Sequence, residues 1–261
     1  CEKRFPRFEF RHRENKGLSA TLNEMVDWAE GKYFTGCASD DIMLPSKISL
    51  LVEKLESSDD SYSVAFGDAI FIDDNSNEVF IDRKTGEYTT EENGSKFFLD
   101  YYTFERDFDY KDEKSFGSYK TLLAGNYLPA MSYVIKLDKI REVGAWTSGN
   151  TIEDWEMWLK LSKNYKFAYI DEPVAFYRWH DSNTCKTMKF ELVRDSIQLF
   201  ENEREYALNR GYENILYSTL VNLIIQLRIH GKTLFIKKIF KYSINPAFIC
   251  AFTIKIFNKI K

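Results

Sequence analysis

The residues best suited to chemistry are two adjacent carboxylates, Asp40 and Asp41, which follow Ser39 at the end of an apolar run over residues 33–38. The run has the composition of a buried strand. Neighbouring carboxylates repel one another unless a cation balances them, and Mg²⁺ is commonly held by one or two carboxylates together with substrate phosphates. The pattern predicts a divalent-metal site, with a solvated turn as the alternative.

A second acidic pair, Glu153 and Asp154, opens an expected helix over residues 153–163. Acidic side chains in a first helical turn are favoured by the helix dipole, which is one explanation of the pair. A carboxylate in this position can also act as a general base if it reaches a substrate proton. The spacing alone leaves both alternatives open.

One histidine of three, His180, follows an expected strand in the segment YRWHDSN. Neutral imidazole is a common metal ligand, so His180 is a candidate partner of the acidic pair. The alternative is a surface histidine at a strand end.

The elements that must position these residues alternate along the chain. Buried strands are expected at residues 61–73 and 130–136, and two more at 167–170 and 174–179, with Pro173 breaking between them. Helices with one apolar face are expected near residues 18–29, after Pro45, near 96–102, at 137–143 and over most of 186–230. The alternation predicts an α/β sandwich.

The composition narrows the class of protein. Hydrophobic residues make up 44% of the 261 positions and aromatic residues 16%, enough for a core and against disorder. The four cysteines are scattered without a CxxC pair, which favours a reducing compartment. No apolar run reaches the roughly 18 residues of a membrane-spanning helix.

Charge is distributed unevenly. Residues 214–261 contain eight Lys or Arg and no Asp or Glu, so the rest of a chain of net charge −4 carries about −12. Within 231–241 a helical projection places Phe235, Ile236, Ile239 and Phe240 on one side and Lys237, Lys238 and Lys241 on the other. This pattern is typical of an interfacial membrane helix, or of a helix packed on the protein with its lysines in solvent. The acidic body argues against nucleic acid as a partner.

Three stretches in order give the chain a family resemblance: ENKGLSATLNEMVDWAEGKYFTGCASDD, IEDWEMWLKL and YRWHDSN. Together they resemble the family-2 glycosyltransferases, which have a GT-A fold, and so imply a mixed sheet flanked by helices. The resemblance implies an inverting, metal-dependent transferase that moves a sugar from a nucleotide-diphosphate sugar to a glycan or lipid-linked acceptor, in bacterial surface polysaccharide synthesis. It also implies a cytoplasmic location at the inner face of the membrane.

The resemblance assigns roles to the residues that match its motifs. Asp154 corresponds to the catalytic base. Asp40 corresponds to a ligand of the Mg or Mn ion, and His180 to a third contact of that ion. Asp41 either binds the ion as well or orients the site. Acceptor contacts fall on Glu153 and Trp155, although tryptophans at helical spacing are more often core residues. Nucleotide-sugar contacts are implied for Asn15, Lys16, Gly17, Ser39, Asp40 and Arg178, where a capped turn at residues 15–17 is the alternative.

Two departures from the family pattern keep other functions open. Ala38 stands where the family usually has a further Asp, and the family's opening nucleotide-binding segment has no counterpart in the sequence. Residues 1–185 are therefore expected to form a partial, N-terminally truncated catalytic domain, followed by a helical region over 186–261 with a basic amphipathic tail. A non-catalytic sugar-nucleotide-binding or scaffold relative, or a metal-dependent hydrolase using the same Asp and His residues, would show the same motifs.

Overall fold

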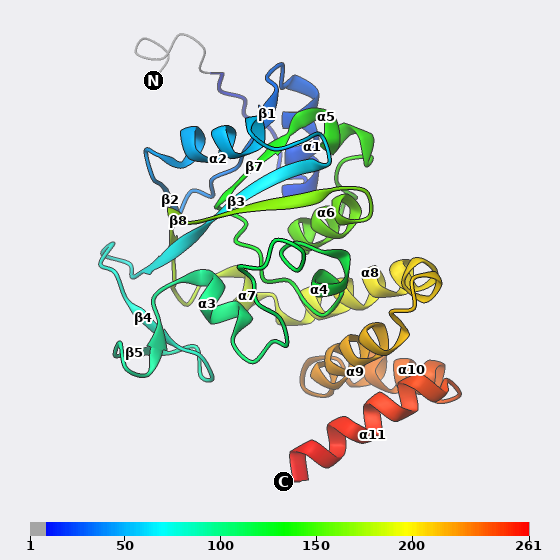
Figure 1. The fold of residues 1–261 in the computed structure, drawn as a ribbon. Helices are drawn as coiled ribbons and strands as arrows, with labels where there is room; N and C mark the ends of the chain where they lie inside the picture. The colour runs from blue at the N-terminus through cyan, green and yellow to red at the C-terminus, as the bar shows by residue number, and fades with distance from the viewer. Residues whose placement is uncertain (1–8, 261) are drawn as a thin grey trace.

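The computed structural model describes residues 9–260 and has a five-stranded mixed sheet at its centre (Figure 1). The strand order is β1-β7-β3-β8-β2, in which only β3 and β8 are parallel neighbours. The strands are β1 (Tyr33–Phe34), β2 (Ile42–Met43), β3 (Tyr62–Ile72), β7 (Tyr133–Lys136) and β8 (Lys166–Arg178).

The central strand β3 is buried along its whole length because helices cover both faces of the sheet. On one face, α2 (Lys47–Glu56) packs Leu51 and Leu55 against the sheet. On the other face, Trp158 of α6 (Glu153–Ser162) lies with its ring centroid 5.0 Å from that of Phe66. A strand covered on both faces is expected to be almost continuously apolar, as this one is.

A small second sheet follows the carboxyl end of β3. It contains β4 (Phe80–Asp82), flanked by β5 (Tyr88–Thr89) and β6 (Gly94–Ser95), and leads into α3 (Phe98–Thr103). A bridge between Ile70 and Phe97 joins this region to β3. The sheet and α3 therefore border the end of β3 at which the candidate site lies.

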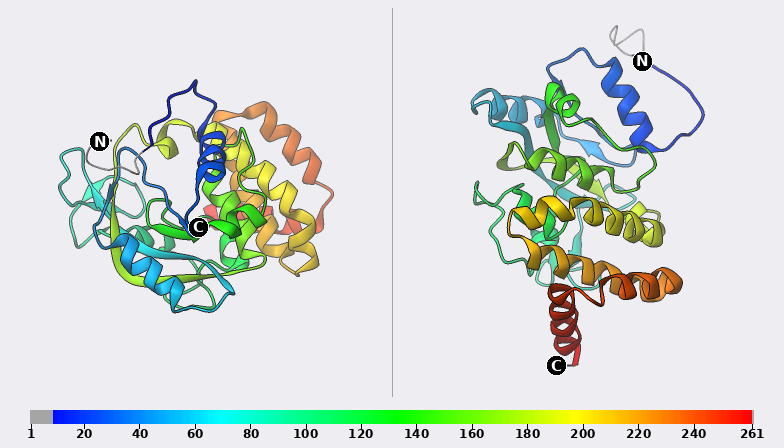
Figure 2. Two further views of the ribbon diagram at one scale, coloured as in Figure 1. Left: turned by 90° about the horizontal axis from the view of Figure 1, so that it is seen from above. Right: turned by 90° about the vertical axis from the view of Figure 1, so that its right-hand side faces the viewer.

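The other helices surround the main sheet and extend it. Phe200 of α8 meets Trp155 of α6 with 5.1 Å between ring centroids, and one apolar cluster continues from Val26 to Phe248. Figure 2 shows α11 at the end of the molecule remote from α1. These helices are α1 (Leu18–Trp28), α4 (Tyr119–Leu123), α5 (Leu137–Glu142), α7 (Thr184–Thr187), α8 (Lys189–Asn209), α9 (Glu213–His230), α10 (Lys232–Tyr242) and α11 (Pro246–Ile260).

The structure divides α10 differently from the helical projection. Phe235 and Ile239 pack on the core, and Lys238 is turned inward to pair with Glu201 at 2.7 Å. Ile236 (54% exposed) and Phe240 (76% exposed) face solvent instead. The predicted separation of an apolar face from a lysine face is therefore wrong, because α10 packs against the rest of the protein with residues of both faces. Among the described residues, no helix is both long and apolar enough to cross a membrane.

Two strand predictions also needed correction. The predicted strand over residues 33–38 is paired only at Tyr33–Phe34, and the rest runs as extended chain toward Asp40. The predicted strands 167–170 and 174–179 are one strand, β8. Pro173 is accommodated by a shift in register opposite Asp68, since a bulge needs no ladder hydrogen bond from the proline nitrogen.

Candidate active site

Arg178, the last residue of β8, fastens the acidic loop to the sheet. Its backbone N–H donates to Asp41 Oδ1 at 3.0 Å, and its Nε–H donates to the Asp40 carbonyl at 2.9 Å. The guanidinium also donates to the carbonyl of Asp73 and, at 3.0 Å, to Ser76 Oγ, in the turn that follows β3. The guanidinium thus joins two loops, and contact with a diphosphate remains a prediction for it.

His180 and Asp40 lie side by side although 140 positions separate them in the sequence. Nε2 of His180 is 3.2 Å from Asp40 Oδ2, and its Nδ1 is 2.7 Å from Ser182 Oγ. The buried side chain of Asn183 accepts from the His180 backbone N–H at 2.7 Å and donates to the Arg178 carbonyl at 3.1 Å. The HDSN segment therefore forms a tight turn that presents the imidazole to the acidic loop.

The donor atoms of Asp40 and His180 fit a divalent cation that takes its remaining ligands from substrate and water. The Asp40 side chain is 43% exposed and its carboxylate faces the imidazole. Asp41 is turned toward the Arg178 backbone, and burial raises the pKa of its carboxyl to about 6. Within residues 9–260, no three His, Cys, Asp or Glu side chains are grouped to hold a metal ion. This geometry favours the orienting alternative for Asp41.

The second acidic pair is half-buried at the start of α6. Asp154 Oδ2 accepts a hydrogen bond from Asn126 Nδ2 at 2.8 Å. Burial raises the pKa of Asp154, and burial together with the neighbouring Asp154 charge raises the pKa of Glu153 to about 7. A carboxyl pair whose pKa values are raised is better suited to accept a proton at physiological pH.

One tyrosine, Tyr133, connects the acidic loop to the carboxylates of α6. The Tyr133 hydroxyl is packed so closely on Gly36 that a Cβ there would lie 3.2 Å from it. Burial, and then the charges of Asp154 and Glu153, raise the pKa of Tyr133. Tyr133 therefore stands between the extended chain that leads to Asp40 and the start of α6.

An aromatic cluster makes a second connection. Phe98 stacks on Tyr102 at 4.3 Å and meets Tyr177 edge-on at 5.4 Å. Burial chiefly raises the pKa of both tyrosines, with a contribution from the Asp40 and Asp41 carboxylates at Tyr177 and from Asp154 at Tyr102. The charges of both acidic groups are thus felt within the same aromatic cluster.

The remaining predicted residues are placed differently. Trp155 is only 8% exposed, and its Nε1–H donates to the Leu122 carbonyl at 2.9 Å, so the assignment to acceptor binding is corrected to the core alternative. Asn15 Oδ1 accepts from the Gly17 N–H at 2.9 Å, and Gly17 has φ +85°, which describes a turn before α1. Lys16 and Ser39 are exposed beside these elements, and no role follows from their contacts.

Lys47 and Asn126 border the site and were missed by sequence reasoning. Lys47 is fully buried, and its Nζ donates to the carbonyls of Gly36 at 2.9 Å and Met131 at 2.8 Å. Its burial lowers the pKa of the ammonium group to about 8. The sequence does carry a signal that Lys47 is buried, because Lys47 shares helical spacing with the core residues Leu51 and Leu55. Asn126 lies in an irregular loop, where no periodic pattern marks it.

Comparisons with known proteins relate part of the chain to a known family. Residues 1–120 match the family model described as glycosyl transferase family 2, which includes the acidic loop and ends before Asp154 and His180. No curated protein matches the chain. Among solved structures, the chain is similar to the mannosyltransferase PcManGT from Pyrobaculum calidifontis in complex with GDP-Man and Mn2+, at 11% identity and a TM-score of 0.47, over 93% of this chain and 67% of that one. Residues 1–120 of the chain are thus similar to glycosyl transferase family 2, and the fold that contains them is a mixed α/β sheet flanked by helices.

Proposed function

We propose that the protein transfers a sugar, with inversion, from a nucleotide-diphosphate sugar to a hydroxyl group of a glycan or lipid-linked acceptor. The observation that carries the proposal is the half-buried Asp154, which is held by Asn126 and whose charge is felt in the same aromatic cluster as that of Asp40, the neighbour of His180. A base for the acceptor hydroxyl, and a site that can hold a cation for the leaving diphosphate, are what a single displacement at the anomeric carbon requires.

Each carboxylate has a role in this reaction. Asp154 takes the proton of the acceptor hydroxyl as its oxygen attacks the anomeric carbon, and the bond to the diphosphate breaks. Glu153, one residue earlier on the helix, orients the acceptor. Asp40 and His180 would hold a Mg or Mn ion, and a bound ion would supply positive charge to the leaving diphosphate. Asp41 and Arg178 keep the acidic loop in place on the end of β8.

The test of the base is Asp154→Asn. Loss of a general base is expected to lower kcat by about 10²–10⁴ while leaving the donor Kd nearly unchanged. Transfer is followed by release of nucleoside diphosphate from a panel of sugar donors, and donor binding by calorimetry. A donor Kd that rises in step with the loss of rate would make Asp154 a binding residue.

The stereochemistry and the rival functions are separated in the same reactions. Proton NMR of the new anomeric centre shows the opposite configuration to the donor if the transfer inverts. Free sugar in place of a transferred product would instead indicate a hydrolase. Donor binding without either product would support the non-catalytic alternative.

The cellular setting is part of the proposal. We place the reaction in bacterial surface polysaccharide synthesis, at the cytoplasmic face of the membrane where a lipid-linked acceptor would lie. The support is the uneven charge of the chain and the exposed Ile236 and Phe240 beside Lys237 on α10. Apolar side chains next to lysines suit peripheral contact with anionic lipid.

A further inference from the structure

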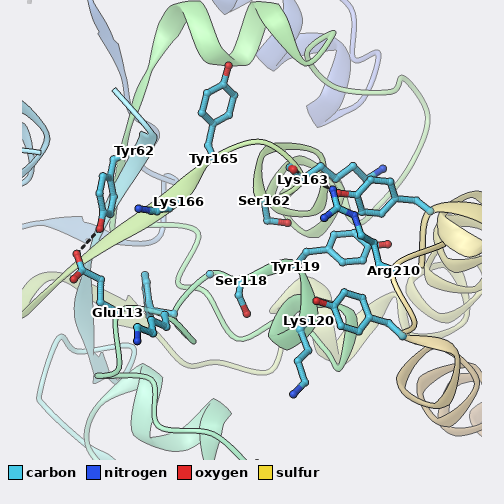
Figure 3. A pocket seen from close by; sticks show the side chains of 15 residues that line it. Tyr62, Glu113, Ser118, Tyr119, Lys120, Ser162, Lys163, Tyr165, Lys166 and Arg210 are labelled. Carbon is cyan, nitrogen blue, oxygen red and sulfur yellow. Dashed lines mark hydrogen bonds between the residues drawn. The ribbon is translucent and has the colours of Figure 1, made fainter. Parts of the chain in front are cut away.

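A basic hollow lies at the end of the main sheet opposite the candidate active site. It has a volume of about 510 Å³, within the range of ligand-binding clefts. Its walls come from the start of β3, the chain around α4, the end of α6 and the end of α8 (Figure 3). Tyr62 begins β3 and Lys166 begins β8. The two residues are paired in the sheet at the edge of the hollow.

The hollow is strongly basic in a chain whose net charge is negative. Five cationic side chains line it against one carboxylate, that of Glu113. Lys163 is paired with Glu203 at 2.7 Å. The other four cations form no ion pair within the part of the chain that the structure describes; they are Lys114, Lys120, Lys166 and Arg210. Cations gathered without counter-charges favour an anionic ligand.

Tyrosines lie among these cations. The Lys166 ammonium lies 5.4 Å from the centroid of the Tyr62 ring, and the Arg210 guanidinium carbon 5.1 Å from that of Tyr206. Tyr119, also in the wall, is fixed by a hydrogen bond from its hydroxyl to Glu203 at 2.8 Å. The tyrosines therefore offer rigid, partly apolar surfaces and hydroxyl groups beside the positive charges.

We propose that this hollow binds an acidic oligosaccharide, a glycan that carries carboxylate or phosphate groups. Lysine and arginine recognise the anionic groups, and tyrosine supplies both faces for sugar rings and hydroxyls for hydrogen bonds. The mixture of five tyrosines with these cations distinguishes the lining from a site for a simple inorganic anion. The inference deepens the proposed function, on which the choice of a glycan rests.

The position of the hollow separates it from the site of transfer. β3 and β8 both begin at the hollow and end at the acidic loop, where Ile72 is paired with Arg178. Eleven residues of β3 at about 3.3 Å each span roughly 35 Å. The hollow would therefore hold a remote part of a growing acceptor and not the sugar donor.

Binding is tested on the full chain with a tetrasaccharide of galacturonic acid, its neutral galactose counterpart, a phosphate-bearing oligosaccharide and inorganic phosphate. The variant Lys166→Gln/Arg210→Gln removes two cations, and Lys84→Gln is the matched surface control. We expect an acidic oligosaccharide to bind more weakly as salt rises, and the double variant to weaken it about tenfold or more. Binding of the neutral sugar should not depend on salt, and the control variant should bind the acidic oligosaccharide as the wild type does.

The ligands distinguish the sources of negative charge, because preference for the galacturonate or for the phosphate-bearing chain identifies the group recognised. Inorganic phosphate binding as well as either oligosaccharide would overturn the glycan assignment, as would equal binding by the double variant and the wild type. Sugar transfer is measured separately, by comparing the wild type with Asp154→Asn. Glycan binding without transfer would count against the proposed function alone, and transfer without glycan binding against the hollow alone.

Discussion

At the scale of single residues, the pH dependence of transfer is expected to follow the Asp154–Asn126 hydrogen bond. This hydrogen bond favours the charged form of Asp154. Burial disfavours the charged form and raises the pKa of Asp154 above its ordinary range. A general base acts when deprotonated, so the rate should rise with pH through the titration of the Glu153–Asp154 pair.

Asn126→Ala removes the bond and should move the acid limb of the kcat/KM profile to higher pH, by about one unit. Asn93→Ala, at an exposed turn, is the control and should leave the profile in place. A limb that does not move in Asn126→Ala would show that Asp154 is not the group that titrates in the profile.

A second residue-scale prediction concerns stability. Asp68 in β3 is 5% exposed, and burial raises its pKa from 3.8 to about 6. The folded state binds the proton of the Asp68 carboxyl more tightly than the unfolded state does. The protonated carboxyl therefore contributes to the free energy of unfolding below pH 4, and this contribution is lost as pH rises through 6. The loss amounts to about 3 kcal/mol.

Asp68→Asn can still accept from the Ala69 and Leu99 N–H groups that now donate to Oδ1. The variant should therefore gain stability relative to wild type between pH 4 and pH 7. Urea unfolding at several pH values measures the difference. A constant difference across that range would mean that Asp68 keeps an ordinary pKa in the folded protein.

Sequence reasoning at this scale succeeded where chemistry limits the residue type. Asp40 and His180 were expected to meet, and their side chains lie 3.2 Å apart. It failed where a side chain has two uses. Arg178 can bind phosphate or bridge loops, and Trp155 can stack or fill a core, so only the packing around each shows which use the fold makes of it.

At the scale of elements, Lys47 joins α2 to the chain that positions the acidic loop. Lys47→Met leaves the carbonyls of Gly36 and Met131 buried without a donor, which should lower the free energy of unfolding by about 1–3 kcal/mol. Transfer should fall as well, because the carbonyl of Gly36 no longer has a fixed position ahead of Asp40.

Lys54→Met, about two helical turns further along α2, is the matched control for hydrophobic substitution. Chemical unfolding and kcat are measured for both variants. Equal stability of the two would mean that the buried hydrogen bonds of Lys47 contribute nothing net.

The elements themselves were largely predictable because their apolar spacing is regular. α1, α2, α5 and α6 lie within a few residues of the expected helices. β8 was divided in error because a single sequence shows Pro173 but not the bulge that accommodates it. β1 was made too long because an apolar composition does not say where a partner strand stops.

At the scale of the whole molecule, the exposed residues of α10 are expected to contact anionic lipid. Deleting the tail would be a poor test, because Tyr242 and Phe248 pack on Tyr217 and their loss would open the core. Substitutions confined to the exposed face avoid this problem.

Ile236→Glu/Phe240→Glu should abolish sedimentation with vesicles containing anionic lipid. Lys232→Gln/Lys237→Gln should weaken it about tenfold or more and reduce its dependence on salt, with Lys84→Gln as control. Vesicle binding that is the same for all variants, or indifferent to anionic lipid, would assign this face to another partner.

The overall class of fold followed from the alternation of strands and helices, whereas the basic hollow could not be predicted. Its lining is drawn from residue 62 to residue 212, and lysines and tyrosines at such separations carry no pattern. The pairing of β3 with β8, and the packing of α4, α6 and α8 beside these strands, bring them together.

The order of the strands also has a consequence for synthesis on the ribosome. β3 pairs with β7 and β8, which follow it by about 60 to 100 positions, so the nascent chain carries an unpaired apolar segment until those strands emerge. Asp68 is the one charged residue within that segment. In the unfolded chain it is ionised and opposes the stacking of like segments into aggregates. The carboxylate that costs the finished protein stability thus protects the unfinished one, and Asp68→Asn should raise stability while lowering soluble yield.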